Sequence, residues 1–301
     1  MTKCSSLSDV VDILTPESQS SPIVFSSPHS GRFYPKDFIE KTNLSALQIR
    51  RSEDAFIDNI FDEAVSFGSP LLSARFPRAY IDPNREPFEL DPGMFDTVLP
   101  SYVNSNSRRI RSGLGTVARI VAGGLEIYKN QLQFSEVKKR IEKHYTPYHK
   151  KLAELVNNTK RRFGACLLID CHSMPSSGGV GDTECGKNWA DIVLGDRYGT
   201  SCAPHITELA FATFRELGYQ VSVNKPYAGG YTTHYYGRPR EGLHSLQIEI
   251  NRALYMDEIN IRQLPSFNNL KSDITEFIAC LTSITSNELI PLPIYEAANS
   301  P

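Results

Sequence analysis

The apolar residues follow two periods along the chain, one typical of β-strands and one typical of α-helices. Short apolar runs predict strands over residues 22–27, 70–76, 166–169, 219–223 and 246–251. Apolar positions three and four residues apart predict helices over residues 45–67, 135–162, 204–217 and 270–284. Because strands and helices alternate, we expect an α/β fold with a largely parallel sheet covered on both sides. In such sheets, ligands bind at the carboxyl ends of the strands.

Residues that start or stop helices support these boundaries. Ser45, with Gln48 three residues later, has the pattern of a capping box. Pro147 should kink or divide the second predicted helix, and Gly164 should end it. The glycine-rich and tyrosine-rich residues 224–244 predict a long loop before the last strand.

The composition limits the class of protein. Of the 301 residues, 40% are apolar and 22% are charged, which predicts a sizeable core and argues against disorder. The formal net charge is −2, so nothing indicates binding to nucleic acid or to an anionic membrane. No apolar run approaches the roughly 20 residues of a membrane helix. Since the N-terminus also lacks the basic start and apolar stretch of a signal peptide, we expect a protein of the cytoplasm.

The chain is expected to form one catalytic domain. This domain should span residues 21–290, preceded by a loosely held leader over residues 1–20 and followed by a tail over residues 291–301. The six cysteines are scattered and include no Cys-x-x-Cys pair, so they are interpreted as free thiols. A cysteine-rich zinc site is therefore not expected.

Two histidines stand at the ends of predicted strands. His29 lies in a Pro-His-Ser-Gly turn, where Gly31 lets the backbone turn sharply and the imidazole project from the sheet. His172 lies two residues after Asp170, so both side chains point to the same face of a strand. Asp170 can then fix the orientation of the ring, as carboxylates often do for metal-bound histidines. Taken alone, each histidine also fits a structural, hydrogen-bonded role.

The last predicted strand, residues 246–251, alternates apolar and polar side chains. Its polar face consists of Gln247, Glu249 and Asn251. A polar row on so apolar a strand requires either a polar cavity or a solvated sheet edge. Because His29, His172 and Glu249 are all predicted at one edge of the sheet, their joint occurrence favours a catalytic site.

Two further segments have the character of substrate-binding elements. In Asp82-Pro-Asn-Arg85, the guanidinium of Arg85 matches a carboxylate, and Asn84 can add a hydrogen bond. A surface turn is the alternative, since Asp-Pro-Asn favours turns. Residues 229–237, rich in glycine, threonine and tyrosine, suggest a lid or substrate wall, or else an ordinary crossover loop.

Together these motifs resemble the N-formylglutamate amidohydrolase (deformylase) family. The resemblance covers roughly residues 22–258 and rests on six segments: His29-Ser-Gly31, Asp82-Pro-Asn-Arg85, Asp170-Cys-His-Ser173, Tyr227-Ala-Gly-Gly-Tyr231, His234-Tyr-Tyr-Gly237 and Gln247-Ile-Glu-Ile-Asn-Arg252. It implies a three-layer α/β sandwich with a central mixed, mostly parallel sheet, similar to zinc carboxypeptidases and aspartoacylases.

The resemblance also implies roles for individual residues. A divalent metal ion, zinc by preference, is expected on His29, His172 and one acid, with Glu249 as general base. Asn84 and Arg85 are expected to bind a substrate carboxylate. The remaining candidates for substrate binding are Tyr231, His234 near the formyl group or the oxyanion, and, for a second carboxylate, Arg119, Arg238 and Arg78.

One departure concerns the acidic metal ligand. The wider group of zinc enzymes has an acid three residues after the first histidine, whereas this chain has Arg32. We expect Asp54 to supply the carboxylate instead, with Glu53 as the alternative. The implied reaction is hydrolysis of the formyl amide of N-formyl-L-glutamate, a small-molecule substrate that arises in histidine breakdown.

Three other functions are compatible with parts of the pattern. The first is a metal-dependent deacylase or carboxypeptidase that acts on another small N-acyl amino acid. The second is a thiol hydrolase that uses Cys171 beside His172, although adjacent strand residues point to opposite faces. The third is a non-catalytic protein that binds small carboxylates through Arg85.

Overall fold

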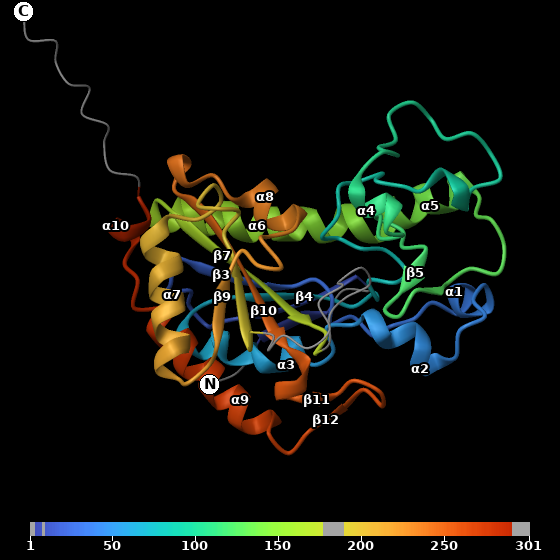
Figure 1. The fold of residues 1–301 in the computed structure, drawn as a ribbon. Coiled ribbons are helices and arrows are strands. Elements are labelled where there is room, and N and C mark those ends of the chain that lie inside the picture. The colour runs from blue at the N-terminus through green and yellow to red at the C-terminus, as the bar shows by residue number, and fades with distance from the viewer. Residues whose placement is uncertain (1–3, 8–9, 177–189, 291–301) are drawn as a thin grey trace, which may run out of the picture.

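The computed structural model describes residues 4–7, 10–176 and 190–290, with residues 4–7 as backbone only. An eight-stranded sheet in the order β1-β2-β4-β3-β7-β10-β8-β9 runs through its centre (Figure 1). Its strands are β1 (Cys4–Leu7), β2 (Val11–Thr15), β3 (Ile23–Ser27), β4 (Leu71–Ala74), β7 (Cys166–Met174), β8 (Ile192–Gly195), β9 (Val221–Val223) and β10 (Leu243–Asn251). The β3–β4, β3–β7, β7–β10 and β8–β9 pairs are parallel, and the others are antiparallel. The prediction of a mixed, mostly parallel sheet is therefore confirmed, although β1, β2 and β8 lie outside the predicted strands.

Helices cover both faces of the sheet. One face packs on α3 (Ile57–Ile60), α7 (Pro204–Glu216) and α9 (Phe267–Leu281), and the other on α5 (Phe134–Arg140) and α6 (Thr146–Phe163). The predicted alternation in the last strand is confirmed, because Leu246, Ile248 and Ile250 all enter the first of these two cores. The three-layer α/β architecture follows from these two cores on opposite faces.

The remaining elements are short. They are the helices α1 (Lys36–Glu40), α2 (Ala46–Ile49), α4 (Arg108–Arg111), α8 (Tyr231–Tyr236) and α10 (Ser286–Leu289), and the hairpins of β5 (Ile120–Val121) with β6 (Leu125–Glu126) and of β11 (Met256–Asp257) with β12 (Arg262–Gln263). In the part of the chain that the structure describes, no helix is both long and apolar enough to span a membrane.

Several local signals act as predicted. Ser45 and Gln48 form a capping box at the start of α2. The helix predicted over residues 135–162 is present as α5 and α6, joined by one π-helical turn that ends just before Thr146 and Pro147. Pro147 occupies the first turn of α6, where its missing N–H costs no helical hydrogen bond. Gly164 ends the helix with a φ of 82°.

The leader expected over residues 1–20 instead contains part of the sheet. β2 pairs with β4 and buries Val11 and Ile13, while Asp12 between them is half-buried. This alternation extends over so few residues that it does not stand out against the polar composition around it. The expected tail over residues 291–301 lies outside the described residues.

The prediction of one helix over residues 45–67 is wrong, because the structure divides this segment into several short elements. Glu53 is extended and Phe56 has a left-handed φ of 69°, so α3 begins only at Ile57. The apolar stripe of the prediction is nevertheless buried in the core. At the break, the Asp54 N–H donates to the carbonyl of His29 at 3.0 Å. Tertiary contacts thus override the local helical pattern and place Asp54 beside His29.

Candidate metal centre and active site

Three buried side chains converge where β3 and β7 end. His29 Nδ1 lies 3.2 Å from Asp54 Oδ2 and 3.1 Å from His172 Nδ1, and His172 Nδ1 lies 3.1 Å from Asp54 Oδ2. The exposed fractions of these residues are 1%, 0% and 2% for His29, Asp54 and His172. The structure therefore brings together the three residues that the sequence suggested as metal ligands.

The turn after β3 is built to hold this arrangement. Gly31 packs directly on the backbone of Phe76, since a Cβ at that position would lie 2.0 Å from the Phe76 carbonyl oxygen. Ser30 Oγ donates to the carbonyl oxygen of Asp54 and accepts from the N–H of Asp58, both at 3.1 Å. The Pro-His-Ser-Gly turn and the segment that carries Asp54 are thus fixed to each other.

A carboxylate stands behind each imidazole. His29 Nε2 lies 2.7 Å from Asp82 Oδ1, and His172 Nε2 lies 3.0 Å from Asp170 Oδ2. Asp82 accepts the Nε2–H of His29, so that ring can present its Nδ1 lone pair to the other ligands. Asp170 lies within ion-pair distance of His172 Nε2, so a second carboxylate can orient the other ring. Metal-bound histidines are typically oriented by such carboxylate partners.

The donor set fits a divalent cation. Two imidazole nitrogens and a carboxylate oxygen face one another at 3.1–3.2 Å, so a cation between them would be bound by all three. For metal–ligand bonds of about 2.0–2.1 Å, the ligands of a tetrahedral zinc site lie about 3.3 Å apart, close to these separations. Two histidines and one carboxylate also leave one position for water or substrate, as catalytic zinc sites do.

The charges around the centre favour the same conclusion. Burial alone would raise the pKa of Asp54, but hydrogen bonds from His172 and His29 hold it well below its usual range. Burial alone would lower the pKa of His172, yet the neighbouring carboxylates, Asp170 first, raise it well above its usual range. Without a metal ion, the centre therefore holds a proton strongly, and the same negative field attracts a divalent ion.

Glu249 lies beside this centre on β10. It is the direct partner of His172 in the parallel pairing of β7 with β10 and is 9% exposed. Burial raises the pKa of Glu249 to about 7, with His172 acting in the opposite direction and Asp54 adding to the rise. A carboxyl group with a pKa near neutrality, next to a metal centre, has the properties of a general base.

Three arginines surround the carboxylates of the centre. Arg252 Nη2 donates to Asp54 Oδ1 at 2.9 Å, which leaves Oδ2 to face the histidines. Arg78 Nη2 donates to Asp82 Oδ2 at 2.9 Å, and its Nη1 lies 3.7 Å from Asp54 Oδ1. Arg85 donates to the carbonyls of Asn84 and Leu114, and its Nη2 lies 3.9 Å from Asp82 Oδ2. Arg78 and Arg85 thus flank Asp82 on the partly exposed side of the site, with side chains 21% and 12% exposed.

The amide of Asn84 faces other groups of the protein and is buried. Its Oδ1 accepts from the Thr232 N–H at 2.8 Å, and its Nδ2 lies 3.4 Å from Asp170 Oδ2 and 3.1 Å from His172 Nε2. Thr232 belongs to α8, a helix inside the segment 224–244 that the sequence pattern predicts as a loop. That prediction is wrong because the cap of α8 comes from Asn84, which is distant in sequence. The contacts of Asn84 orient other groups of the site and leave little for a substrate carboxylate.

The other residues suggested for substrate binding lie further out. Arg119 pairs with Asp91 and Glu126, and Arg238 pairs with Glu241, on the surface. His234 is an exposed residue of α8. Tyr231 is half-buried at the start of that helix, and its ring packs near His149. The structure does not bring Arg119 or Arg238 into any described contact with the three metal-ligand candidates.

Two alternatives from the sequence are disfavoured by the contacts. Glu53, the alternative to Asp54, is held by two hydrogen bonds from Arg50 and one from Tyr34. Cys171 is buried in the core on the face opposite His172, and burial raises the pKa of its thiol well above the usual range. A thiolate–imidazole pair is therefore not formed by these residues.

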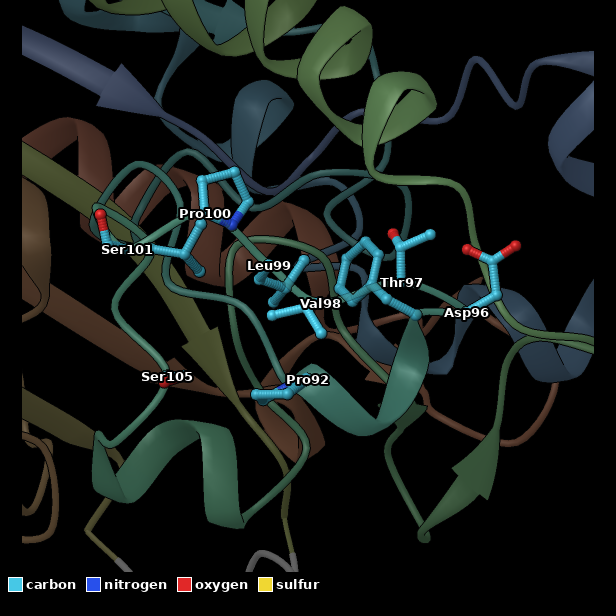
Figure 2. Close-up of a pocket in the computed structure, with 10 residues that line it drawn as sticks. Pro92, Asp96, Thr97, Val98, Leu99, Pro100, Ser101 and Ser105 are labelled. Atoms are coloured by element: carbon cyan, nitrogen blue, oxygen red, sulfur yellow. The ribbon is translucent and has the colours of Figure 1, made fainter.

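A surface hollow of about 570 Å³ lies elsewhere (Figure 2). It is lined by residues of the segment 92–105, among them Phe95, Val98 and Leu99, with Asp96 as its one acid. None of its lining residues belongs to the group of His29, Asp54 and His172. This hollow is therefore separate from the candidate metal centre.

Sequence reasoning missed three contributors to the site. Asp82 stands in a turn motif in which only Asn84 and Arg85 attracted attention. Arg252 directly follows the polar row of the last strand, and Gln247 belongs to that row. A signal was present for Gln247, since a buried strand with a polar face needs partners for each polar group.

Comparisons with known proteins agree with this geometry. The model of the family described as N-formylglutamate amidohydrolase matches residues 21–256, a range that includes all four central residues: His29, Asp54, His172 and Glu249. An N-formylglutamate deformylase from Pseudomonas putida is 28% identical over 240 residues, 79% of this chain and 82% of that protein. One from Pseudomonas aeruginosa is 27% identical over 241 residues, 79% and 83% of the two chains.

Two solved structures are similar to this chain in fold. The crystal structure of N-formylglutamate amidohydrolase from Ralstonia eutropha JMP134 is 36% identical, with a TM-score of 0.84 over 91% of this chain and 97% of that one. A protein from Agrobacterium tumefaciens, 16% identical with a TM-score of 0.64 over 92% and 96% of the chains, shares the fold. The family match over most of the chain and the intact buried centre lead to one conclusion: this protein belongs to the N-formylglutamate amidohydrolase family.

Proposed function

We propose that this protein hydrolyses the formyl amide of N-formyl-L-glutamate to formate and L-glutamate, with the help of a divalent metal ion. The observation that carries the proposal is the buried group of His29, Asp54 and His172 with Glu249 beside it on the next strand. Family membership supports amide hydrolysis as the class of reaction. Zinc is the proposed ion, because two imidazoles and one carboxylate match its preferred ligands.

The ion would be held by His29 Nδ1, His172 Nδ1 and Asp54 Oδ2. When bound, a divalent ion at this site supplies a Lewis acid that polarises a carbonyl oxygen and makes water more acidic. The protein contributes the orientation of the ligands through Asp82, Asp170 and Arg252.

Glu249 is proposed as the general base. Its carboxylate takes a proton from the attacking water and later delivers a proton to the nitrogen of the leaving amine. Water thus adds to the formyl carbon, the C–N bond breaks, and the products are formate and a free amino group. A pKa of about 7 for Glu249 suits both directions of proton transfer near neutral pH.

Arg85 and Arg78 are proposed to bind the two carboxylates of the substrate. Both guanidiniums are partly exposed and lie near Oδ2 of Asp82, whose Oδ1 contacts His29. Tyr231 and His234 on α8 are proposed as part of the substrate wall. Among the arginines suggested for the second carboxylate, Arg78 is favoured because Arg119 and Arg238 are paired with surface acids.

The proposal is tested by formate release together with metal analysis. The purified protein should contain a divalent ion and release formate from N-formyl-L-glutamate. A panel of N-formyl-L-glutamine, N-acetyl-L-glutamate and a dipeptide separates the role of the second carboxylate from that of the formyl group. Faster turnover of the acetyl compound or of the dipeptide would replace the proposed substrate by another N-acyl amino acid.

The role of Glu249 is tested by a near-isosteric change. Glu249→Gln removes the base but keeps the size of the side chain, so we expect bound metal and KM to persist and kcat to fall by about 10²–10⁴-fold, the contribution typical of a general base. Glu208→Gln, the same acid-to-amide change at an exposed position of α7, serves as the control. Normal turnover in Glu249→Gln would exclude Glu249 as the base.

A further inference from the structure

We propose that Gln247 is a positioning residue that holds Glu249 in place, and that the start of α8 sets the orientation of its amide. This inference rests on the proposed function, in which Glu249 is the base. Gln247 Nε2 donates to Glu249 Oε1 at 3.0 Å, and the Gly230 N–H donates to Gln247 Oε1 at 2.8 Å. Gln247 is 3% exposed.

The direction of these hydrogen bonds is unambiguous. A backbone N–H can only donate, so the Gly230 N–H must meet the oxygen of the Gln247 amide. The NH₂ group of Gln247 therefore has to face Glu249 and donates to its carboxylate. A glutamate at position 247 would keep the acceptor for Gly230 but would place a second carboxylate against Glu249.

Two glycines allow the backbone to approach Gln247 closely. Gly195 of β8 pairs with Gln247 in the sheet, and a Cβ there would lie 2.8 Å from the backbone of Ala228 and Gly229. A Cβ on Gly230 would lie 2.4 Å from both Nδ2 and Oδ1 of Asn84. Because neither glycine has a Cβ, the backbone can place the Gly230 N–H over the side chain of Gln247.

The first turn of α8 also binds Asn84, which lies beside His172. Its Thr232 N–H donates to Asn84 Oδ1, which turns Asn84 Nδ2 toward Asp170 and His172. Two N–H groups that a helix start leaves without helical partners are thus used on Asn84 and Gln247. The same turn supports the orienting carboxylate of His172 and the side chain of Glu249.

The test compares Gln247→Met and Gln247→Glu with Gln263→Met, which makes the same change at an exposed strand position. Kinetics are measured with N-formyl-L-glutamate, and the zinc dissociation constant is measured by chelator competition. Because small displacements of a reacting group cost about 10²-fold in rate, we expect kcat to fall by about 10–100-fold in both Gln247 variants. In Gln247→Met, KM and zinc affinity should stay within about threefold of wild type, and Gln263→Met should match wild type.

Gly230→Ala extends the test to the start of α8. It should lower zinc affinity as well as kcat, because the new methyl group displaces Asn84, whereas Gly93→Ala should change neither. The inference is overturned if Gln247→Met keeps wild-type kcat, or if its kcat falls only in proportion to lost zinc. A wild-type protein that hydrolyses no N-acyl amino acid would instead contradict the proposed function, so the two failures are distinguishable.

Discussion

Two histidines close together in the fold show how partners decide the behaviour of a buried imidazole. His172 faces Asp170 and Asp54, and these carboxylates raise its pKa although burial opposes them. His149 of α6 bonds to the carbonyl of Pro83 and to the hydroxyl of Tyr236, and burial lowers its pKa to about 4. Carboxylates make the first site suitable for a cation, whereas neutral partners make the second a structural support.

The region around His149 supports the metal centre from behind. His149 Nε2 donates to the Pro83 carbonyl at 2.8 Å, and Tyr145 OH donates to the Arg85 carbonyl at 2.8 Å. Both carbonyls belong to the turn that carries Asp82 and Arg85. The aromatic side chains thus fix the backbone of the turn, while the carboxylates of the centre provide its charge.

The largest expected difference between the two histidines concerns metal binding. His172→Ala removes one of three ligands and should weaken zinc binding by more than about 10³-fold, leaving no ion after purification. His149→Gln keeps a donor for the Pro83 carbonyl and should bind zinc within about threefold of wild type. Elemental analysis and chelator competition measure both. Equal zinc content in the two variants would remove the distinction between the regions.

The carboxylates behind the ligands should have the next largest effect. Asp170→Asn and Asp82→Asn keep the shape of the side chain but remove its charge, so each should weaken metal affinity by about 10–100-fold. The matched control is Asp91→Asn, which affects a surface pair with Arg119. If zinc affinity proved insensitive to both changes, the carboxylates would not orient the histidines.

Much of this arrangement follows from short-range sequence patterns. His29 and His172 stand at predicted strand ends, and the alternation around Glu249 sets its face, so the topology of a parallel sheet is sufficient to expect them together. The position of Asp54 depends on a break in a segment with a helical pattern, which only the contact with His29 explains. The resemblance alone indicates Asp54, and its contact with His29 gives the physical reason.

Other parts of the site depend on contacts between distant segments. Asn84 looks like a substrate ligand in a turn motif, but its partners lie in α8 and β7, far along the chain. Arg252 neutralises one oxygen of Asp54 across roughly two hundred positions, and no local pattern indicates that pairing. Such tertiary hydrogen bonds have no periodicity in sequence, so they could not be predicted from it.

The pH dependence of stability should also distinguish His149 from His172. An unfolded histidine has a pKa near 6.5, and His149 in the folded protein has a pKa of about 4, so the unfolded state binds the proton more tightly. Stability is therefore lost as pH falls below about 6.5 and continues to fall toward pH 4. At pH 4.5 this amounts to about 2–3 kcal/mol of unfolding free energy.

His149→Gln should remove that contribution. Urea unfolding of metal-free protein at pH 7 and pH 4.5 measures the free energy of unfolding in wild type and variant, and the difference between them isolates His149 from the carboxylates, which both proteins share. The decrease on acidification should be smaller in the variant. An identical decrease in both proteins would mean that His149 is not held in its neutral form.

Zinc titration of metal-depleted protein tests whether one divalent ion on His29, Asp54 and His172 is required for amide hydrolysis. Formate release from N-formyl-L-glutamate is measured at each addition. Activity should rise linearly and level off at about one zinc ion per chain, as expected for a single tight catalytic site. Full activity in the metal-depleted protein before any zinc is added would contradict this requirement.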